Sequence, residues 1–139
     1  MSYAVREGDP TSTGGFIMSA SSSHLVDLQR VARMGDPVWC AACQSVGYVA
    51  QGNPTFVDEF VAVCTHGNVV KCACMPGSHT VIATQQALSA DMEATIEIPQ
   101  DLAEKAQKEA ERINRDIREG TFNPKTLSPF GQRLNVERQ

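Results

Sequence analysis

The hydrophobic positions of residues 1–86 come in short, largely β-branched runs, and a turn signal ends each run after a few residues. Glycine, proline, asparagine and aspartate at such even spacing are typical of short strands in a compact β domain. The polar stretch 19–23 is interpreted as a loop or a sheet edge. The predicted strands are 4–6, 16–19, 25–28, 29–34, 47–51, 55–57, 60–64 and 80–84.

The pattern changes in residues 87–139, where a connector (87–99) leads into the clearest helix of the chain (100–119). Asp101 suits the first turn of this helix, and Gly120 suits the position just after its last turn. Apolar residues recur there at intervals of three or four, which places them on one helical face. They are Leu102, Ala106, Ala110, Ile113 and Ile117.

This apolar stripe is narrow and holds few large side chains, so two interpretations stay open. The helix can pack on the β domain, or it can wait for a partner. The segment after Gly120 carries scattered apolar residues, including Phe122 and Phe130, among prolines and glycine. We expect this tail to be extended and docked, or disordered when the protein is alone.

A short phrase built around glycine recurs along the β region. It reads VREGDP at 5–10, ARMGDP at 32–37 and, in a shortened form, THGN at 65–68. Five residues after the three glycines come Thr13, Cys40 and Cys72, so one turn presents a different side chain at the same local position. Internal repetition is a strong guide to architecture. It predicts three similar hairpins that share one apex and one metal ion.

The bulk composition narrows the function classes. The 139 residues fit one small domain with an appendage. A net charge of −4 argues against binding to nucleic-acid backbones as the main role. The apolar runs are too short to span a bilayer, and the N-terminus lacks the pattern of an ordinary signal peptide. We therefore expect a protein that is made in the cytoplasm and starts out reduced.

All five cysteines lie between positions 40 and 74, which in a reducing compartment indicates metal ligands or catalytic thiols rather than disulfides. Cys40 and Cys43 have the spacing at which one loop supplies two thiolates, and a second cysteine-rich loop follows about 30 residues on. The sequence thus predicts a zinc site. The candidate ligands are Cys40, Cys43, Cys72, Cys74, His79 and His66.

Other interpretations of these residues stay open. A CxxC pair also suits redox chemistry, but no βαβ pattern surrounds this one. Cys64 follows an apolar run and is interpreted as a buried small hydrophobic residue. His66 precedes the third turn and is either a ligand or a turn residue, whereas His24 is interpreted as a surface histidine of a strand.

Enzymatic chemistry has little support in the sequence, because no nucleophile elbow or phosphate-binding loop is present. Asp9 and Asp36 occupy equivalent turns, and paired carboxylates can act as acid and base. Their repetition favours a structural role instead, in which each accepts backbone N–H groups of its own turn. Arg6 and Arg33 repeat in the same way and are expected to pair with carboxylates or carbonyls between hairpins.

The segments AVREGDPTSTGGFIMSASSS, VARMGDPVWCAAC and HGNVVKCACMPGSHTVIA resemble the proline-alanine-alanine-arginine (PAAR) repeat proteins over about residues 3–86. The resemblance implies a small cone of β-hairpins with a zinc ion near its sharp end. It also implies that the blunt face sits on the trimeric valine-glycine repeat (VgrG) spike of a type VI secretion system. Thr13 departs from the family pattern, since many relatives have a histidine there. Either Cys74 or His79 then fills the gap, or the site lacks that ligand.

The leading hypothesis is a non-enzymatic spike tip, with a zinc-binding domain at 1–86 and an adaptor segment at 87–139. The adaptor would recruit an effector or a chaperone, or lie along the spike, and the protein would leave the cytoplasm through the secretion apparatus. One alternative is the N-terminal part of a longer effector, and another is a free cytosolic zinc-binding or thiol module. The predicted partner-binding residues of the adaptor are Leu102, Ala106, Ile113, Ile117, Phe122 and Phe130.

Overall fold

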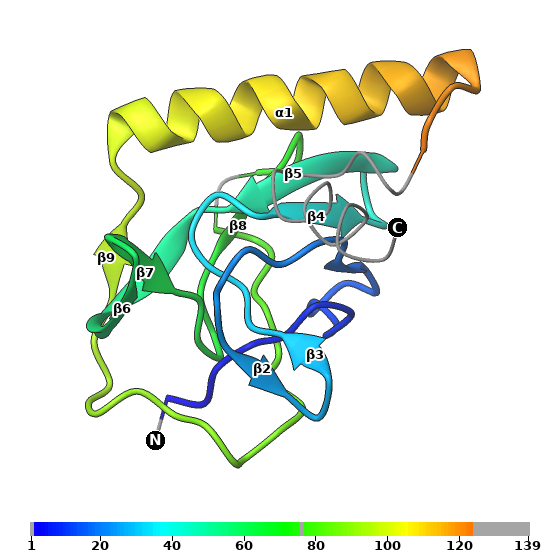
Figure 1. Cartoon of the computed structure of the whole chain (residues 1–139). Coiled ribbons are helices and arrows are strands. Elements are labelled where there is room, and N and C mark those ends of the chain that lie inside the picture. The colour runs from blue at the N-terminus through cyan, green and yellow to red at the C-terminus, as the bar shows by residue number, and fades with distance from the viewer. Residues whose placement is uncertain (1, 76, 124–139) are drawn as a thin grey trace.

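The computed structural model describes residues 2–75 and 77–123, which form a mainly β domain followed by one helix (Figure 1). This confirms the predicted fold class. The strands are β1 (Phe16–Ile17), β2 (Leu25–Val26), β3 (Gln29–Arg30), β4 (Pro37–Cys40), β5 (Ser45–Val49), β6 (Gln51–Asp58), β7 (Val61–Val63), β8 (Val70–Lys71) and β9 (Ile96–Glu97). The described part of the chain contains no helix that is both long and apolar enough to cross a membrane.

The centre of the β domain is a closed ring of three backbone hydrogen bonds. The amide of Ala32 donates to the carbonyl of Val5 at 2.8 Å, Cys64 donates to Ala32 at 2.8 Å, and Val5 donates to Cys64 at 3.0 Å. All three residues are fully buried. Val5 and Ala32 begin the first two copies of the repeated phrase and Cys64 directly precedes the third, so the three repeats surround one pseudo-threefold axis.

The glycine turns of the three repeats share one conformation. Gly8, Gly35 and Gly67 have φ values of 87°, 93° and 89°, a region that residues with a Cβ rarely adopt. Each glycine amide donates to a carbonyl on the returning arm of its hairpin, at 2.8–2.9 Å. The acceptors are Ile17, Val49 and Val81, respectively. The recurrence of glycine in the sequence is therefore a backbone requirement of the turn.

The residue after each glycine fastens its turn with a side-chain oxygen. Asp9, Asp36 and Asn68 each accept the backbone N–H of the residue three positions earlier, at 2.8 Å. The predicted structural role of the two aspartates is confirmed. The repeated arginines connect hairpins as expected, because Arg6 donates to the carbonyl of Val26 and Arg33 to that of Asp58.

Asp36 should make stability depend on pH. Burial raises the pKa of its carboxyl to about 7, and hydrogen bonds from the Ser21 and Arg33 amides offset only part of that rise. Since this value exceeds the unfolded-state pKa near 3.8, protonation favours the folded protein. The unfolding free energy should therefore fall as the pH rises from about 4 to about 7.

Asp36→Asn should remove that part of the pH dependence, because an asparagine oxygen already serves the same turn at Asn68. Urea unfolding of both proteins at pH 5.5 and 8 measures the difference. Between pH 5.5 and pH 8 the unfolding free energy of the parent should fall by about 1–3 kcal/mol more than that of the variant. Equal pH slopes in the two proteins would contradict the assignment.

The strands form three small antiparallel sheets, ordered β1-β4-β5-β8, β2-β3 and β7-β6-β9. Strands β4 and β8 were not predicted, because Pro37 was interpreted as part of a turn and residues 70–71 are too few to form a pattern. The predicted strands 4–6 and 80–84 are present only as isolated bridges, such as Ala4 with Thr65 and Thr11 with Val81. Of the predicted strands 25–28 and 29–34, residues 25–26 and 29–30 pair as the β2–β3 hairpin, and residues 31 and 33 form isolated bridges.

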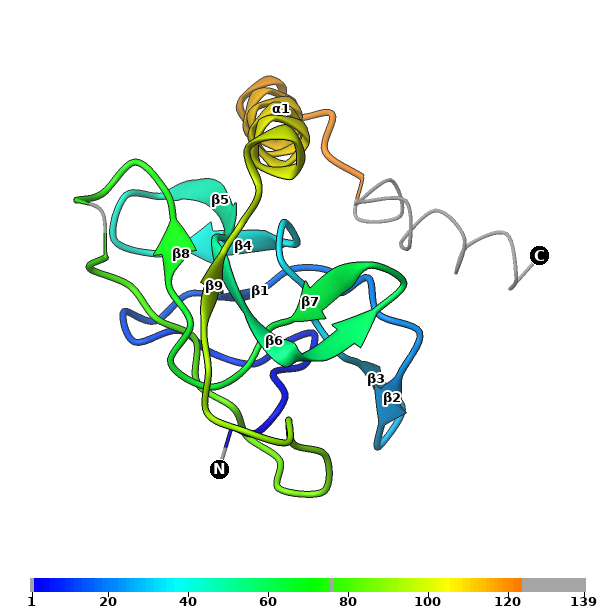
Figure 2. The same cartoon turned by 90° about the vertical axis from the view of Figure 1, so that its left-hand side faces the viewer.

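The helix α1 (Gln100–Glu119) has the predicted bounds, and Gly120 ends it in the left-handed conformation at φ 74°. It lies across β4 and β5, as Figures 1 and 2 show. Asn114 fastens it by accepting the amide of Val46 at 2.7 Å and donating to its carbonyl at 3.1 Å. These bonds serve a part of β5 that lies beyond the end of its pairing with β8.

The apolar stripe of the helix packs against the β domain of the same chain. Ala106, Ala110 and Ile113 are buried, and Ile113 packs in a cluster with Val46. A partner therefore cannot contact Ala106 or Ile113 unless the helix leaves the sheet. Of the other residues predicted to bind a partner, Leu102 and Phe122 are partly buried, and Ile117 is 38% exposed. Phe130 lies outside the described residues.

Candidate metal centre

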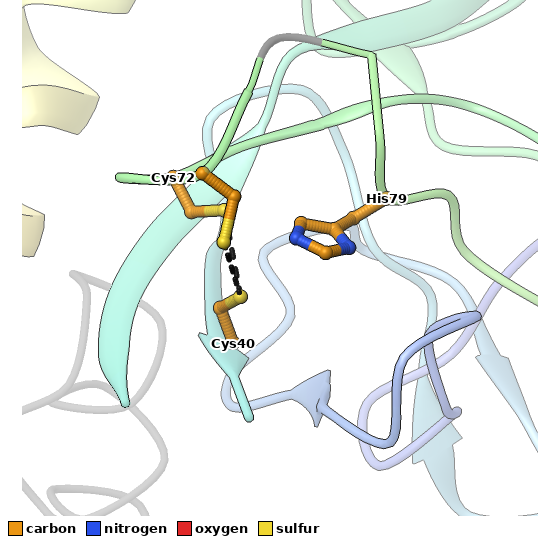
Figure 3. A group of neighbouring side chains, drawn as sticks. Cys40, Cys72 and His79 are labelled. Atoms are coloured by element: carbon orange, nitrogen blue, oxygen red, sulfur yellow. Dashed lines mark hydrogen bonds between the residues drawn. The ribbon is translucent and has the colours of Figure 1, made fainter. Parts of the chain in front are cut away.

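Two of the three hairpins bring thiols and an imidazole together at one end of the domain. Cys40 is the last residue of β4, and Cys72 follows β8 directly. The third hairpin then doubles back, and the amide of Val70 donates to the carbonyl of His79 at 3.0 Å. Figure 3 shows the side chains of Cys40, Cys72 and His79 converging from these strands.

Four potential ligand atoms, from Cys40, Cys72, Cys74 and His79, lie within 4.8 Å of one another. The sulfur of Cys40 is 3.5 Å from that of Cys72 and 3.8 Å from that of Cys74. Cys40 is 2% exposed and His79 is 5% exposed. Two of the four candidate ligand residues, Cys40 and His79, are thus buried, whereas Cys72 and Cys74 are partly exposed.

The buried imidazole carries the strongest sign of a missing partner. Both ring nitrogens of His79 are buried and neither has a hydrogen-bond partner. Buried polar atoms without partners are costly and rare. Coordination of a metal ion by one of the two nitrogens would remove the cost of burying that nitrogen. Three thiolates and one imidazole are a donor set that zinc takes in structural sites, so the residues fit the predicted ion.

The thiols of Cys72 and Cys74 resist ionisation when no cation is near them. Burial raises the pKa of Cys72 well above its usual value, and burial together with hydrogen bonds to Cys43 and Cys40 raises that of Cys74. A divalent cation reverses this, because coordinated thiols lose their protons. Metal binding by this group should therefore release protons.

Cys43 lies beside the group but outside it. Its sulfur is 3.0 Å from the Ser45 hydroxyl. Burial opposes ionisation of this thiol, but hydrogen bonds from Ser45, Cys40, the Ala73 amide and Cys74 outweigh it and lower its pKa to about 6. Its sulfur does not lie within 4.8 Å of all four grouped atoms. Cys43 therefore lies outside the group of four, and its role as a ligand stays a prediction.

The remaining histidines and cysteine lie elsewhere. His66 stands at the third glycine turn, where its Nδ1 accepts the amide of Ala83 at 3.1 Å, and it is not among the four grouped residues. His24 is exposed and packs edge-on against Phe56. Cys64 is fully buried on the pseudo-threefold axis, and burial raises the pKa of its thiol well above the usual value.

The first hairpin contributes no donor to the group of four, and it is also shorter than the others. Nine residues separate Gly8 from its acceptor Ile17, whereas fourteen separate the paired residues of the second and third hairpins. Thr13, the counterpart of Cys40 and Cys72, has a buried hydroxyl oxygen with no hydrogen-bond partner. The third hairpin compensates by supplying three of the four donors.

Comparison with known proteins gives one match. Residues 7–86, more than half of the chain, match the family model described as PAAR motif. The comparisons with curated proteins and with solved structures found no match. The matched segment contains all three glycine turns and all four grouped ligands.

Proposed function

Since this chain belongs to the PAAR-motif family, we propose that it is the tip of a type VI secretion spike. Its β domain would cap the trimeric VgrG spike and sharpen it. The observation that carries the proposal is the pseudo-threefold ring around Val5, Ala32 and Cys64, built by a single chain.

A single chain that caps a homotrimer faces a mismatch of symmetry. Three identical subunits offer three identical surfaces, whereas an irregular monomer can match one of them at most. Three similar repeats around one axis remove this mismatch, because each subunit then meets a nearly equivalent surface. One copy per trimer follows from the same argument.

Zinc would hold the narrow end of the tip together. A small β domain with few large apolar side chains gains much of its stability from a structural metal ion. The four grouped donors would tie the second hairpin to the third, at the end where little apolar core is available. A role of this kind needs no catalytic chemistry, so we propose a structural rather than an enzymatic protein.

The segment 87–139 would attach cargo. Asn114 and Ile113 anchor α1 to β5, which gives the chain that follows a fixed point of departure from the tip. An effector or a chaperone would bind beyond this point, and Ile117 would lie near it. On this proposal the protein is made in the cytoplasm and leaves with the spike.

The proposed function predicts a defined complex. Purified protein mixed with the trimeric spike should give a species of one chain per trimer that contains one zinc ion, measured by native mass spectrometry and metal analysis. A folded, zinc-loaded protein that stays unbound at micromolar concentrations of the trimer would overturn the spike-tip assignment.

A further inference from the structure

Two connections between the repeats end in turns that place a large apolar side chain in water. Asp27-Leu28 joins β2 to β3, and Glu59-Phe60 joins β6 to β7. These four residues have φ values of 50–71°, and hairpin turns of this kind favour asparagine and glycine. Leu28 is nevertheless 93% exposed and Phe60 101%. The fold gains nothing from either side chain, which points to contact with another molecule.

An acidic residue followed by a large apolar one occurs a third time as Asp91-Met92, in a bend without positive φ values, with Met92 64% exposed. The three pairs are spaced by 32 residues: 27–28, 59–60 and 91–92. The hydrogen bonds around the axis give the same correspondence independently. Three equivalent amides donate at 2.9 Å to three equivalent carbonyls: Met18 to Pro37, Ala50 to Val69 and Ile82 to Pro10. Each of these donors lies ten positions before the exposed apolar residue of its connection, which is Leu28, Phe60 or Met92.

Side-chain contacts hold the three connections together. The first and second meet where the Ser22 hydroxyl donates to Asp58 at 2.7 Å. The second and third meet where the Asn53 amide group donates to the carbonyl of Met92 at 2.7 Å. Arg6 links the third connection to the first. Its guanidinium donates to the carbonyl of Val26 in the first connection and to the hydroxyl of Thr84, which leads into the third.

The connections lie away from the metal centre. In Figure 2 the β2–β3 and β6–β7 hairpins project to the right, whereas the loop from β4 to β5 and the loop after β8, which carry the thiols, lie on the left. The turns that carry Leu28 and Phe60 therefore lie on the other side of the domain from the loops that carry the thiols. Hydrogen bonds fix the backbone of the three connections, so the spacing of their exposed side chains is set before any partner binds.

We propose that Leu28, Phe60 and Met92 are three equivalent anchors, which enter three equivalent apolar pockets on the end of a homotrimer. The acidic residue before each anchor would face a basic side chain at the rim of its pocket. This inference deepens the proposed function and rests on it, since it names the residues through which the tip would grip its trimeric partner.

Both the symmetry and the chemistry favour this occupant. Exposed apolar residues at three equivalent positions match a partner whose pockets repeat three times around an axis. Large side chains in central pockets carry most of the affinity of protein interfaces, and neighbouring charges set orientation and partner choice. Asp27, Glu59 and Asp91 all carry the same sign, which favours a basic rim, and Asp27 also lies 3.6 Å from Nη1 of Arg6 in its own chain.

The first test is the triple variant Leu28→Ser, Phe60→Ser and Met92→Ser, measured for binding to the VgrG trimer. These side chains touch little of their own domain, so the circular dichroism spectrum and the zinc content should stay unchanged. We expect a loss of affinity of about tenfold for each single change and of two or more orders of magnitude for the triple variant. Met75→Ser is the matched control, because Met75 is 79% exposed and directly follows Cys74 in the loop after β8.

The second test places a photoreactive benzoylphenylalanine at position 28, 60 or 92 of the full chain. Equivalent anchors should cross-link to one and the same peptide of the trimer subunit from all three positions. Cross-links to three unrelated peptides, or a triple variant that binds within about threefold of the parent, would overturn the inference while the spike-tip function stands. A parent chain that binds no trimer would overturn the proposed function, and the named partner with it.

Discussion

Replacing Cys40 with serine is expected to abolish stoichiometric zinc binding and to lower the unfolding temperature by about 10 °C or more. Cys40 is the one grouped donor from the second hairpin, so without it the remaining three donors all come from the third. The ion would then no longer join two hairpins. Losing about 2–3 kcal/mol is a large fraction of the stability of a small domain.

The control for this experiment is Cys43→Ser, three residues away in the same hairpin. Cys43 is bonded to Ser45 and lies outside the grouped donors, so this variant should keep its zinc and its unfolding temperature. Metal analysis by mass spectrometry and thermal unfolding with and without a chelator measure both. Loss of zinc in the Cys43 variant but not in the Cys40 variant would show that Cys43, and not Cys40, ligates the ion.

Gly47→Ala is the second substitution expected to be severe. An alanine Cβ at Gly47 would stand 2.0 Å from the carbonyl oxygen of Lys71 and 2.9 Å from the Cα of Cys72. Both are backbone atoms, so β5 and β8 would have to separate. Overpacking costs about 1–3 kcal/mol where side chains can yield, and more is expected here. The shift would also carry Cys72 away from Cys40, so zinc affinity should fall together with stability.

Gly77→Ala separates this steric effect from the loss of glycine freedom. Gly77 has a φ of 79° but no atom within 4 Å of the position that a Cβ would take. Its replacement should cost about 1 kcal/mol from backbone strain, with little effect on zinc. Chemical denaturation and zinc competition titrations of both variants provide the comparison. Equal losses for the two glycines would contradict the steric account.

The parts of the fold that could be predicted are those with a local cause. The glycine turns need one backbone conformation, so their sequence repeats and identifies them. The helix 100–119 follows from its spacing of apolar residues and its final glycine. Strand β8 could not be found this way, because two residues form no pattern and only pairing of Val70 with Val49 makes them a strand.

The candidate site was predicted less completely, because ligand choice depends on how the hairpins return. His66 and His79 were comparable in sequence, and only the bond from Val70 to His79 brings the latter toward the thiols. The exposed anchors were missed altogether. Their signal was available as the 32-residue recurrence of an acidic and an apolar residue, but it lies in connections where little repetition is expected.

The ring formed by Val5, Ala32 and Cys64 also bears on how the chain acquires its structure. None of the three hydrogen bonds of this ring can form within one repeat, since each joins residues at least 27 positions apart. One repeat by itself forms none of these three bonds and two neighbouring repeats form only one of them, and contacts between distant segments slow the search for the native state. A ribosome-bound chain should stay open until the third repeat has emerged, and then fold in one cooperative step.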